Sequence, residues 1–162
     1  MTLAASTRRT ATRHELYQAV VQETVHLIDG VDDVVANLAN VAALLRQRFG
    51  FFWVGFYFLR GDRLVLGPFQ GSPACVYLEK PHGVCWAAVL RESPVVVPDV
   101  HQFPGHIACD PESKSEIVVP LRDKSGRIRG VLDVDSDQLA AFDDEDVHGL
   151  SRLAEVLAEV WG

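Results

Sequence analysis

Three cysteines are the residues of this sequence best suited to chemistry, and their surroundings differ. Cys85 lies between apolar neighbours, which is typical of a buried thiol that only fills space, and the same holds less firmly for Cys75. Cys109 instead lies in a polar stretch rich in Gly, Pro and His, where a thiol can be ionised and reached. The sequence therefore predicts that Cys109 is the reactive cysteine.

The spacing of these cysteines does not indicate a metal site. They are 10 and 24 residues apart with no Cys-x-x-Cys pair, unlike the ligands of zinc knuckles and ribbons. His106 and Cys109, three residues apart, could form a site with one further cysteine, but buried free thiols explain the pattern better. We expect no metal and no cofactor.

A second constellation consists of acids. Asp133 and Asp135 alternate with apolar residues, so on a strand both carboxylates face one side, although Asp is depleted in strands and like charges repel there. Glu116 begins the preceding predicted strand and would lie across a hairpin from this pair. The alternative is that Asp133 faces solvent and Asp135 only ends the strand. If the three acids converge, they form a pocket for an ammonium group, and crowding raises one pKa until that acid can donate a proton.

A third feature is aromatic. Trp53, Gly55 and Tyr57 are two residues apart and share one face of a predicted strand. Aromatic residues in strands usually belong to the core. The alternative is that these residues form a pocket wall, with Gly55 leaving room for a ligand between the two rings.

The elements that must position these residues follow from hydrophobic periodicity and turn signals. Apolar residues recur at helical spacing over 15–29, 33–49, 84–91 and from about 143 onward. Extended patterns cover 51–59, 64–69, 74–78, 95–97, 116–121 and 128–134, while 98–115 fits neither period. Hairpin turns at 61–62 and 123–126 favour antiparallel pairing. We predict an α+β fold with a central antiparallel sheet and helices packed against it.

Length and composition limit the remaining possibilities. The 162 residues are enough for one domain, which we place at 15–162 after a disordered tail over 1–14. A net charge of −7 argues against nucleic acid as a partner, and no apolar run approaches the roughly 20 residues that span a bilayer. An odd number of cysteines favours a reducing compartment, so we expect a cytoplasmic protein.

Seven ordered motifs, taken together, resemble the free methionine-(R)-sulfoxide reductases, which are built on the GAF domain. The resemblance covers about residues 15 to 160, and several motifs in order are far more specific than any one alone. The motifs are Val-Gly-Phe-Tyr (54–57), Leu-Val-Leu-Gly-Pro-Phe-Gln-Gly (64–71), Ala-Cys-Val (74–76), Gly-Val-Cys (83–85), Gly-His-Ile-Ala-Cys-Asp (105–110), Ser-Glu-Ile-Val-Val-Pro-Leu (115–121) and Gly-Val-Leu-Asp-Val-Asp-Ser (130–136).

This resemblance implies thiol-dependent reduction of free L-methionine-(R)-sulfoxide to L-methionine, with poor action on the residue within proteins. Cys109 would attack the sulfoxide sulfur and become a sulfenic acid as methionine leaves. Cys75 would resolve the sulfenic acid as a disulfide, with Cys85 as a second or alternative resolving thiol. Thioredoxin would then reduce the enzyme, and family members tend to form homodimers.

The resemblance also assigns binding roles. Glu116, Asp133 and Asp135 would hold the amino group of the substrate and protonate the sulfoxide oxygen. Trp53 and Tyr57 would surround its methyl and sulfoxide end. The preference for the R epimer, the preference for the free amino acid and the electron donor rest on the resemblance alone.

One position departs from the family pattern. Trp86 follows Gly-Val-Cys where a small residue, usually Gly, is expected. A bulky indole beside Cys85 could restrict that segment, which puts the resolving role of Cys85 in doubt and leaves that of Cys109 untouched.

Two other classes of function remain open at this point. The main alternative is a GAF module that senses a small ligand or an oxidant without turnover. The other is a hydrolase that uses Cys109 with His101 or His106 as its base. A hydrolase would act without a reductant, whereas the reductase turns over only with a thiol donor.

Overall fold

The computed structural model describes residues 10–106 and 109–162. Its helices are α1 (Arg13–Ile28), α2 (Val34–Phe49), α3 (Gly83–Arg91) and α4 (Asp144–Leu157), with short 3-10 turns η1 (Val100–Gln102) and η2 (Ala158–Val160). Its strands are β1 (Trp53–Arg60), β2 (Arg63–Gln70), β3 (Tyr77–Glu79), β4 (Val95–Val97), β5 (Ser115–Arg122) and β6 (Ile128–Ser136).

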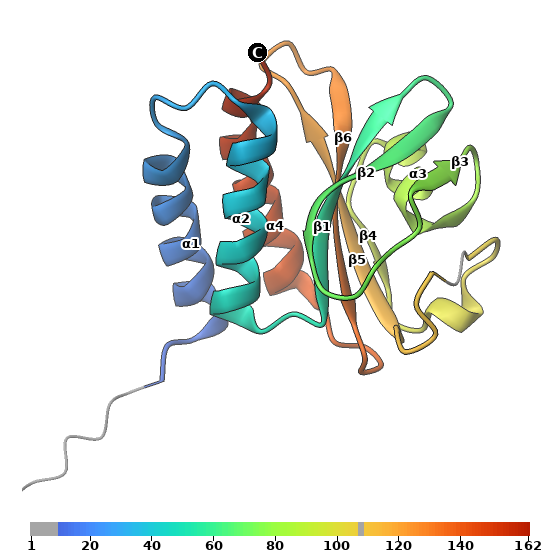
Figure 1. The fold of residues 1–162 in the computed structure, drawn as a ribbon. Coiled ribbons are helices and arrows are strands. Elements are labelled where there is room, and N and C mark those ends of the chain that lie inside the picture. The colour runs from blue at the N-terminus through green and yellow to red at the C-terminus, as the bar shows by residue number, and fades with distance from the viewer. Residues whose placement is uncertain (1–9, 107–108) are drawn as a thin grey trace, which may run out of the picture.

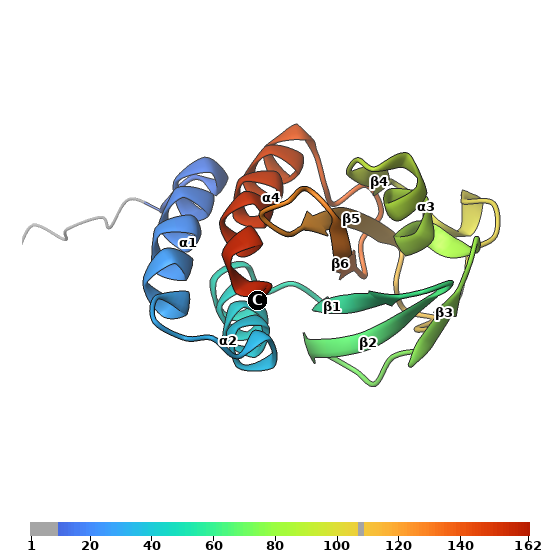
Figure 2. The ribbon, with the colours of Figure 1, turned by 90° about the horizontal axis from the view of Figure 1, so that it is seen from above.

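The six strands form one sheet in the order β3-β2-β1-β6-β5-β4, with every neighbouring pair antiparallel. Helices α1, α2 and α4 form a layer on one side of this sheet, while α3 lies on the other side (Figures 1 and 2). The predicted α+β fold, with a central antiparallel sheet covered by helices, is confirmed.

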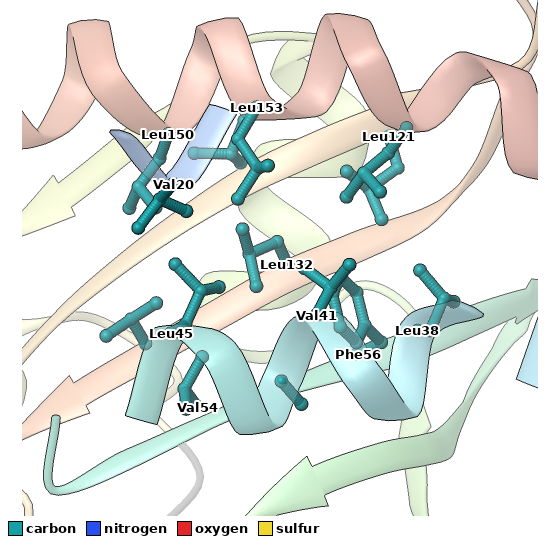
Figure 3. Packing of buried hydrophobic residues seen from close by; sticks show 14 of the residues in the cluster. Val20, Leu38, Val41, Leu45, Val54, Phe56, Leu121, Leu132, Leu150 and Leu153 are labelled. Atoms are coloured by element: carbon teal, nitrogen blue, oxygen red, sulfur yellow. The ribbon is translucent and has the colours of Figure 1, made fainter. Parts of the chain in front are cut away.

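The strands carry two different faces because their side chains alternate. Val54 and Phe56 of β1 join the larger core, which lies between the sheet and the three-helix layer. Figure 3 shows this packing, with Leu132 of β6 facing α2 and α4. The intervening residues of the same strands point to the α3 side, and Trp53 and Tyr57 belong to the second core there. Polar residues on that second face are therefore buried beneath α3 and its neighbouring loops.

Local sequence signals explain where the helices begin and end. The Asp33 side chain accepts a hydrogen bond from the Ala36 backbone N–H and caps α2, which ends at Gly50 with φ of 66°. Asp143 and Asp146 form a reciprocal capping box at the start of α4. These caps fix the helical layer that supports β1 and β6.

Two boundaries differ from expectation. Helix α1 begins at Arg13 with Thr12 as its cap, two residues before the expected start of the domain, and residues 1–9 of the expected tail lie outside the described residues. The strand predicted over 74–78 begins only at Tyr77, so Cys75 lies in a loop. Among the residues described, no helix has both the length and the apolar character needed to cross a membrane.

Candidate active site

A pocket opens on the α3 side of the sheet and is enclosed by β1, β5, β6, the first turn of α3 and two loops. We call these the Cys75 loop (residues 71–76) and the Cys109 loop (residues 109–114). Seven of the eight site residues predicted from sequence line the pocket, and the eighth, Cys75, is bonded to one of them. The predicted residues in the lining are Trp53, Tyr57, Cys85, Cys109, Glu116, Asp133 and Asp135.

The strand register brings the three acids together. Glu116 of β5 lies directly opposite Asp135 of β6, and Asp133 is two residues further along the same face. Glu116 and Asp133 are each only 6% exposed, so the alternative that Asp133 faces solvent is wrong. One oxygen of Asp133, Oδ1, is buried without a hydrogen-bond partner among the described residues. The predicted convergence of three carboxyl groups is confirmed.

Burial raises the pKa values of these acids above those of acids in water. Desolvation, followed by the negative charge of Asp133, raises the pKa of both Glu116 and Asp135 well above their usual range. Desolvation also raises the pKa of Asp133 to about 6, while hydrogen bonding with Glu116 and Cys85 works in the opposite direction. With a pKa of about 6, Asp133 is the member that can be ionised near neutral pH, while burial favours the protonated forms of Glu116 and Asp135, which can donate a proton.

The cysteines divide into a pair and a single thiol. Cys75 and Cys109 form a disulfide with a Cα–Cα distance of 5.4 Å, and they are 34 residues apart in sequence. Cys75 is therefore not a mere space-filling thiol. Cys85 is free and buried in α3, and its pKa is raised by desolvation and then by the charge of Asp133. Its environment suppresses the thiolate, in agreement with the expectation of an inert buried thiol.

The described residues offer one set of neighbouring side chains that resembles a metal site. The Sγ atom of Cys85 and carboxylate oxygens of Glu116 and Asp133 lie within 4.8 Å of one another, all buried. The set predicted as a weaker alternative, built on His106 and Cys109, has no thiolate to offer because Cys109 is in the disulfide.

The aromatic residues of β1 hold the Cys75 loop. The Trp53 indole N–H donates a hydrogen bond to the Ser72 carbonyl at 3.0 Å, and the Tyr57 hydroxyl donates to the Cys75 carbonyl at 2.9 Å. Burial raises the pKa of Tyr57, so its hydroxyl stays a donor. Both aromatic residues also line the pocket, so they form part of its wall and hold the Cys75 loop in place.

The alternative that Gly55 leaves room for a ligand between the two rings is wrong. A Cβ added at Gly55 would lie 2.4 Å from the Cβ of Phe69 and 2.8 Å from the Trp53 ring. The Trp53 ring stacks on Phe69 with centroids 5.4 Å apart. The space that glycine leaves is filled by this stack, which fixes the indole as a wall of the pocket.

Trp86, which the sequence predicts to restrict the segment around Cys85, ties α3 to β3. It is 2% exposed, and its indole N–H donates to the Leu78 carbonyl at 2.7 Å. The adjacent Cys85 is held by the same packing, which agrees with the expectation that the indole restricts this segment.

Sequence reasoning missed the part of the pocket formed by the start of α3. His82 and Gly83 line the pocket together with Val84, and the cap residue His82 makes no side-chain capping hydrogen bond. The first backbone N–H groups of a helix lack partners within the helix and form its positive end. The only sequence signal was the Pro-His-Gly break before an apolar run. The pocket thus has acids on the sheet side and a helix N-terminus on the other.

Comparisons with known proteins agree on one family. The family model described as GAF domain matches residues 10–161. The free methionine-R-sulfoxide reductase of Escherichia coli (strain K12) is 47% identical over 147 residues, which cover 90% of this chain and 88% of that protein. GAF domain-containing protein A of Dictyostelium discoideum is 49% identical over 146 residues, covering 90% of this chain and 92% of that protein.

A solved structure gives the same result in three dimensions. The X-ray structure of free methionine-R-sulfoxide reductase from Neisseria meningitidis, in complex with its substrate, superimposes with a TM-score of 0.90. The two chains are 45% identical, and the match covers 94% of this chain and 92% of that one.

Proposed function

Because this chain belongs to the GAF-domain family of the free methionine-R-sulfoxide reductases, we propose that it reduces free L-methionine-(R)-sulfoxide to L-methionine at the pocket beneath α3. The observation that carries the proposal is the disulfide between Cys75 and Cys109 at the edge of a pocket lined by the buried Glu116 and Asp133 and the half-buried Asp135. A redox-active cysteine pair and proton donors are the two things that sulfoxide reduction requires.

The charge distribution of the pocket suits a free amino acid. The α-ammonium group would bind the acids, with ionised Asp133 as its counter-charge and the unpartnered Oδ1 of Asp133 as an acceptor. The α-carboxylate would bind the backbone N–H groups that begin α3 at Gly83. A methionine sulfoxide residue inside a protein lacks both charges, so its backbone would leave both groups of the pocket unpaired. This explains a preference for the free amino acid.

The sulfoxide end would lie against Trp53 and Tyr57, within reach of the Cys109 sulfur once the disulfide is reduced. The Cys109 thiolate attacks the sulfoxide sulfur, the oxygen passes to the cysteine, and methionine leaves with Cys109 as a sulfenic acid. Protonation of the sulfoxide oxygen makes the sulfur electrophilic, and Glu116 or Asp135, with their raised pKa values, would supply that proton.

Cys75 would complete the oxidised half of the cycle. Its sulfur bonds to that of Cys109, and the hydroxyl of the sulfenic acid leaves as water with the thiol proton. A dithiol donor, which the family resemblance identifies as thioredoxin, then reduces the disulfide by exchange. We assign Cys85 no redox step, because it is buried and Trp86 fixes the helix that carries it. The same resemblance leads us to propose a homodimer, and the odd number of cysteines leads us to propose a cytoplasmic location.

The test is methionine release from separate R and S epimers of free methionine sulfoxide, with dithiothreitol or thioredoxin as donor. We expect release from the R epimer only, dependent on the donor and abolished by Cys109→Ser. Cys75→Ser should release about one methionine per enzyme and leave oxidised Cys109 that dimedone can trap. Absence of release from either epimer by folded, reduced protein would contradict the proposal and favour the ligand-sensing module.

A further inference from the structure

The two cysteine loops are joined by a hydrogen bond as well as by the disulfide. The Ser72 hydroxyl donates to Oδ2 of Asp110 at 2.6 Å, across 38 residues of sequence. Ser72 is three residues before Cys75, and Asp110 directly follows Cys109. Within the described residues this is the only hydrogen bond between the Cys75 loop and the Cys109 loop. We call it the Ser72–Asp110 contact.

Each side of this contact is fixed to its own support. The Ser72 carbonyl accepts from the Trp53 indole at 3.0 Å, which ties that residue to β1. The other oxygen of Asp110, Oδ1, accepts from the Glu112 backbone N–H at 2.9 Å. The Cys109 loop is in turn tied to the end of β6, where the Lys114 backbone N–H donates to the Ser136 carbonyl at 2.7 Å. None of these hydrogen bonds uses an atom of Cys75 or Cys109.

We propose that Ser72 and Asp110 are positioning residues for disulfide formation. In the reduced enzyme their hydrogen bond holds the two loops together, and so it sets how often the Cys75 thiol meets the Cys109 sulfenic acid. In that step the sulfur–sulfur bond forms, the sulfur–oxygen bond breaks, and hydroxide leaves with the thiol proton as water. The sulfoxide has already supplied the oxidising equivalents, so no further oxidant is needed.

This inference rests on the proposed function for its first assay. In a single turnover without donor, methionine release and the lifetime of the dimedone-reactive sulfenic acid are followed separately. Ser72→Ala should release methionine at the wild-type rate, while the sulfenic acid should persist about tenfold longer, since a hydrogen bond to a charged group orients the reacting loops. Ser72→Thr retains a hydroxyl and should restore the wild-type lifetime.

The chain offers a matched control. Ser125 also donates to a carboxylate at 2.6 Å, from its hydroxyl to Asp123 Oδ1, in the turn between β5 and β6. Ser125→Ala removes the same kind of hydrogen bond away from the cysteines. It should change neither the rate of methionine release nor the lifetime of the sulfenic acid. A sulfenic acid lifetime in Ser72→Ala equal to that of wild type would overturn the proposal.

A second measurement does not depend on the substrate. In glutathione buffers of defined ratio, the dithiol and disulfide forms come to equilibrium, and Ser72→Ala should shift that equilibrium toward the dithiol by about tenfold. If wild-type protein releases no methionine, the proposed function is wrong. The equilibrium still tests whether the Ser72–Asp110 contact favours disulfide formation. An unchanged equilibrium in Ser72→Ala overturns the inference whatever the methionine assay gives.

Discussion

Asp133 is a carboxyl group in a buried position, where its ionised form is unfavourable. This single residue therefore links the stability of the protein to its function. Burial raises its pKa from 3.8 to about 6, and one of its oxygens has no hydrogen-bond partner among the described residues. A folded-state pKa above the unfolded value means that ionisation opposes folding above pH 6, and that this opposition vanishes below pH 3.8. Under the proposed function, a substrate ammonium group would satisfy this residue.

Asp133→Asn should therefore stabilise the protein while weakening substrate binding. The shift of about two pKa units corresponds to an increase of up to about 3 kcal/mol in the free energy of unfolding at pH 7. Urea unfolding at pH 7 and at pH 4 measures this gain, which should shrink at the lower pH. Asp137→Asn, at an exposed position just beyond β6, is the control. An equal gain for Asp133→Asn at both pH values would show that the charge is not its cause.

The raised pKa values predict a bell-shaped pH dependence of kcat/KM for the R epimer. On the acid side, activity should fall as Asp133 takes up a proton near pH 6 and loses its hold on the ammonium group. On the alkaline side, activity should fall as Glu116 and Asp135 lose the proton they donate. Glu116→Gln should lower kcat about a hundredfold and change the alkaline limb. If that variant keeps the wild-type profile, Glu116 is not part of the acid.

The sequence predicted the residues of the acid cluster, because strand alternation and hairpin register are local rules. It did not predict the Ser72–Asp110 contact. That hydrogen bond joins two irregular loops that are 38 residues apart, and no periodicity links such positions. Nor did it predict the role of Gly55, since its space is filled by the Trp53 ring of the same strand stacked on Phe69 of β2, a pairing between strands that the sequence does not show.

At the scale of elements, strand β1 carries the site by presenting different residues on its two faces. Its inner residues pack under the three-helix layer, and Trp53 and Tyr57 of the opposite face hold the Cys75 loop. The strand predicted over 74–78 begins only at Tyr77, because the Cys75 carbonyl accepts a hydrogen bond from the Tyr57 hydroxyl rather than from a neighbouring strand. The helices were predicted more closely because their caps and apolar faces are encoded locally.

Gly55→Ala tests how tightly β1 is packed against its neighbours. The added methyl group would overlap Phe69 and the Trp53 ring, so the free energy of unfolding should fall by about 1 to 3 kcal/mol. Displacement of the indole should also raise KM for the sulfoxide. Chemical denaturation and steady-state kinetics measure the two effects. A variant with wild-type stability and KM would show that Trp53 moves aside freely and does not form a fixed wall.

At the scale of the whole molecule, the disulfide divides the protein into two forms that should differ in stability. It closes a loop of 34 residues, and the entropy model gives roughly 4 kcal/mol in favour of the oxidised form. Thermal unfolding with and without a reductant should show a lower Tm for the reduced wild type. Cys75→Ser, which cannot form the bond, should show no effect of reductant. Equal Tm values for both wild-type forms would contradict this entropic stabilisation by the disulfide.

The overall architecture and the family could both be predicted from sequence. The α+β fold is confirmed by the sheet order, and the resemblance is confirmed by relatives at 47% identity and by a TM-score of 0.90. These properties are spread over many positions, so errors at single elements such as the third strand did not alter them. Details of the pocket depend on a few loop contacts, and there the sequence was insufficient.

The burial of Cys85 has a practical consequence. In the oxidised protein it is the single free thiol, 4% exposed, with its pKa raised by its surroundings. Thiol reagents act on the thiolate, so maleimide labelling of Cys85 should be slow in the folded protein and faster when α3 lifts from the sheet or the domain unfolds. The rate of labelling therefore follows the opening of the molecule itself. Cys85 can therefore report on local opening and unfolding of the native protein without an engineered labelling site.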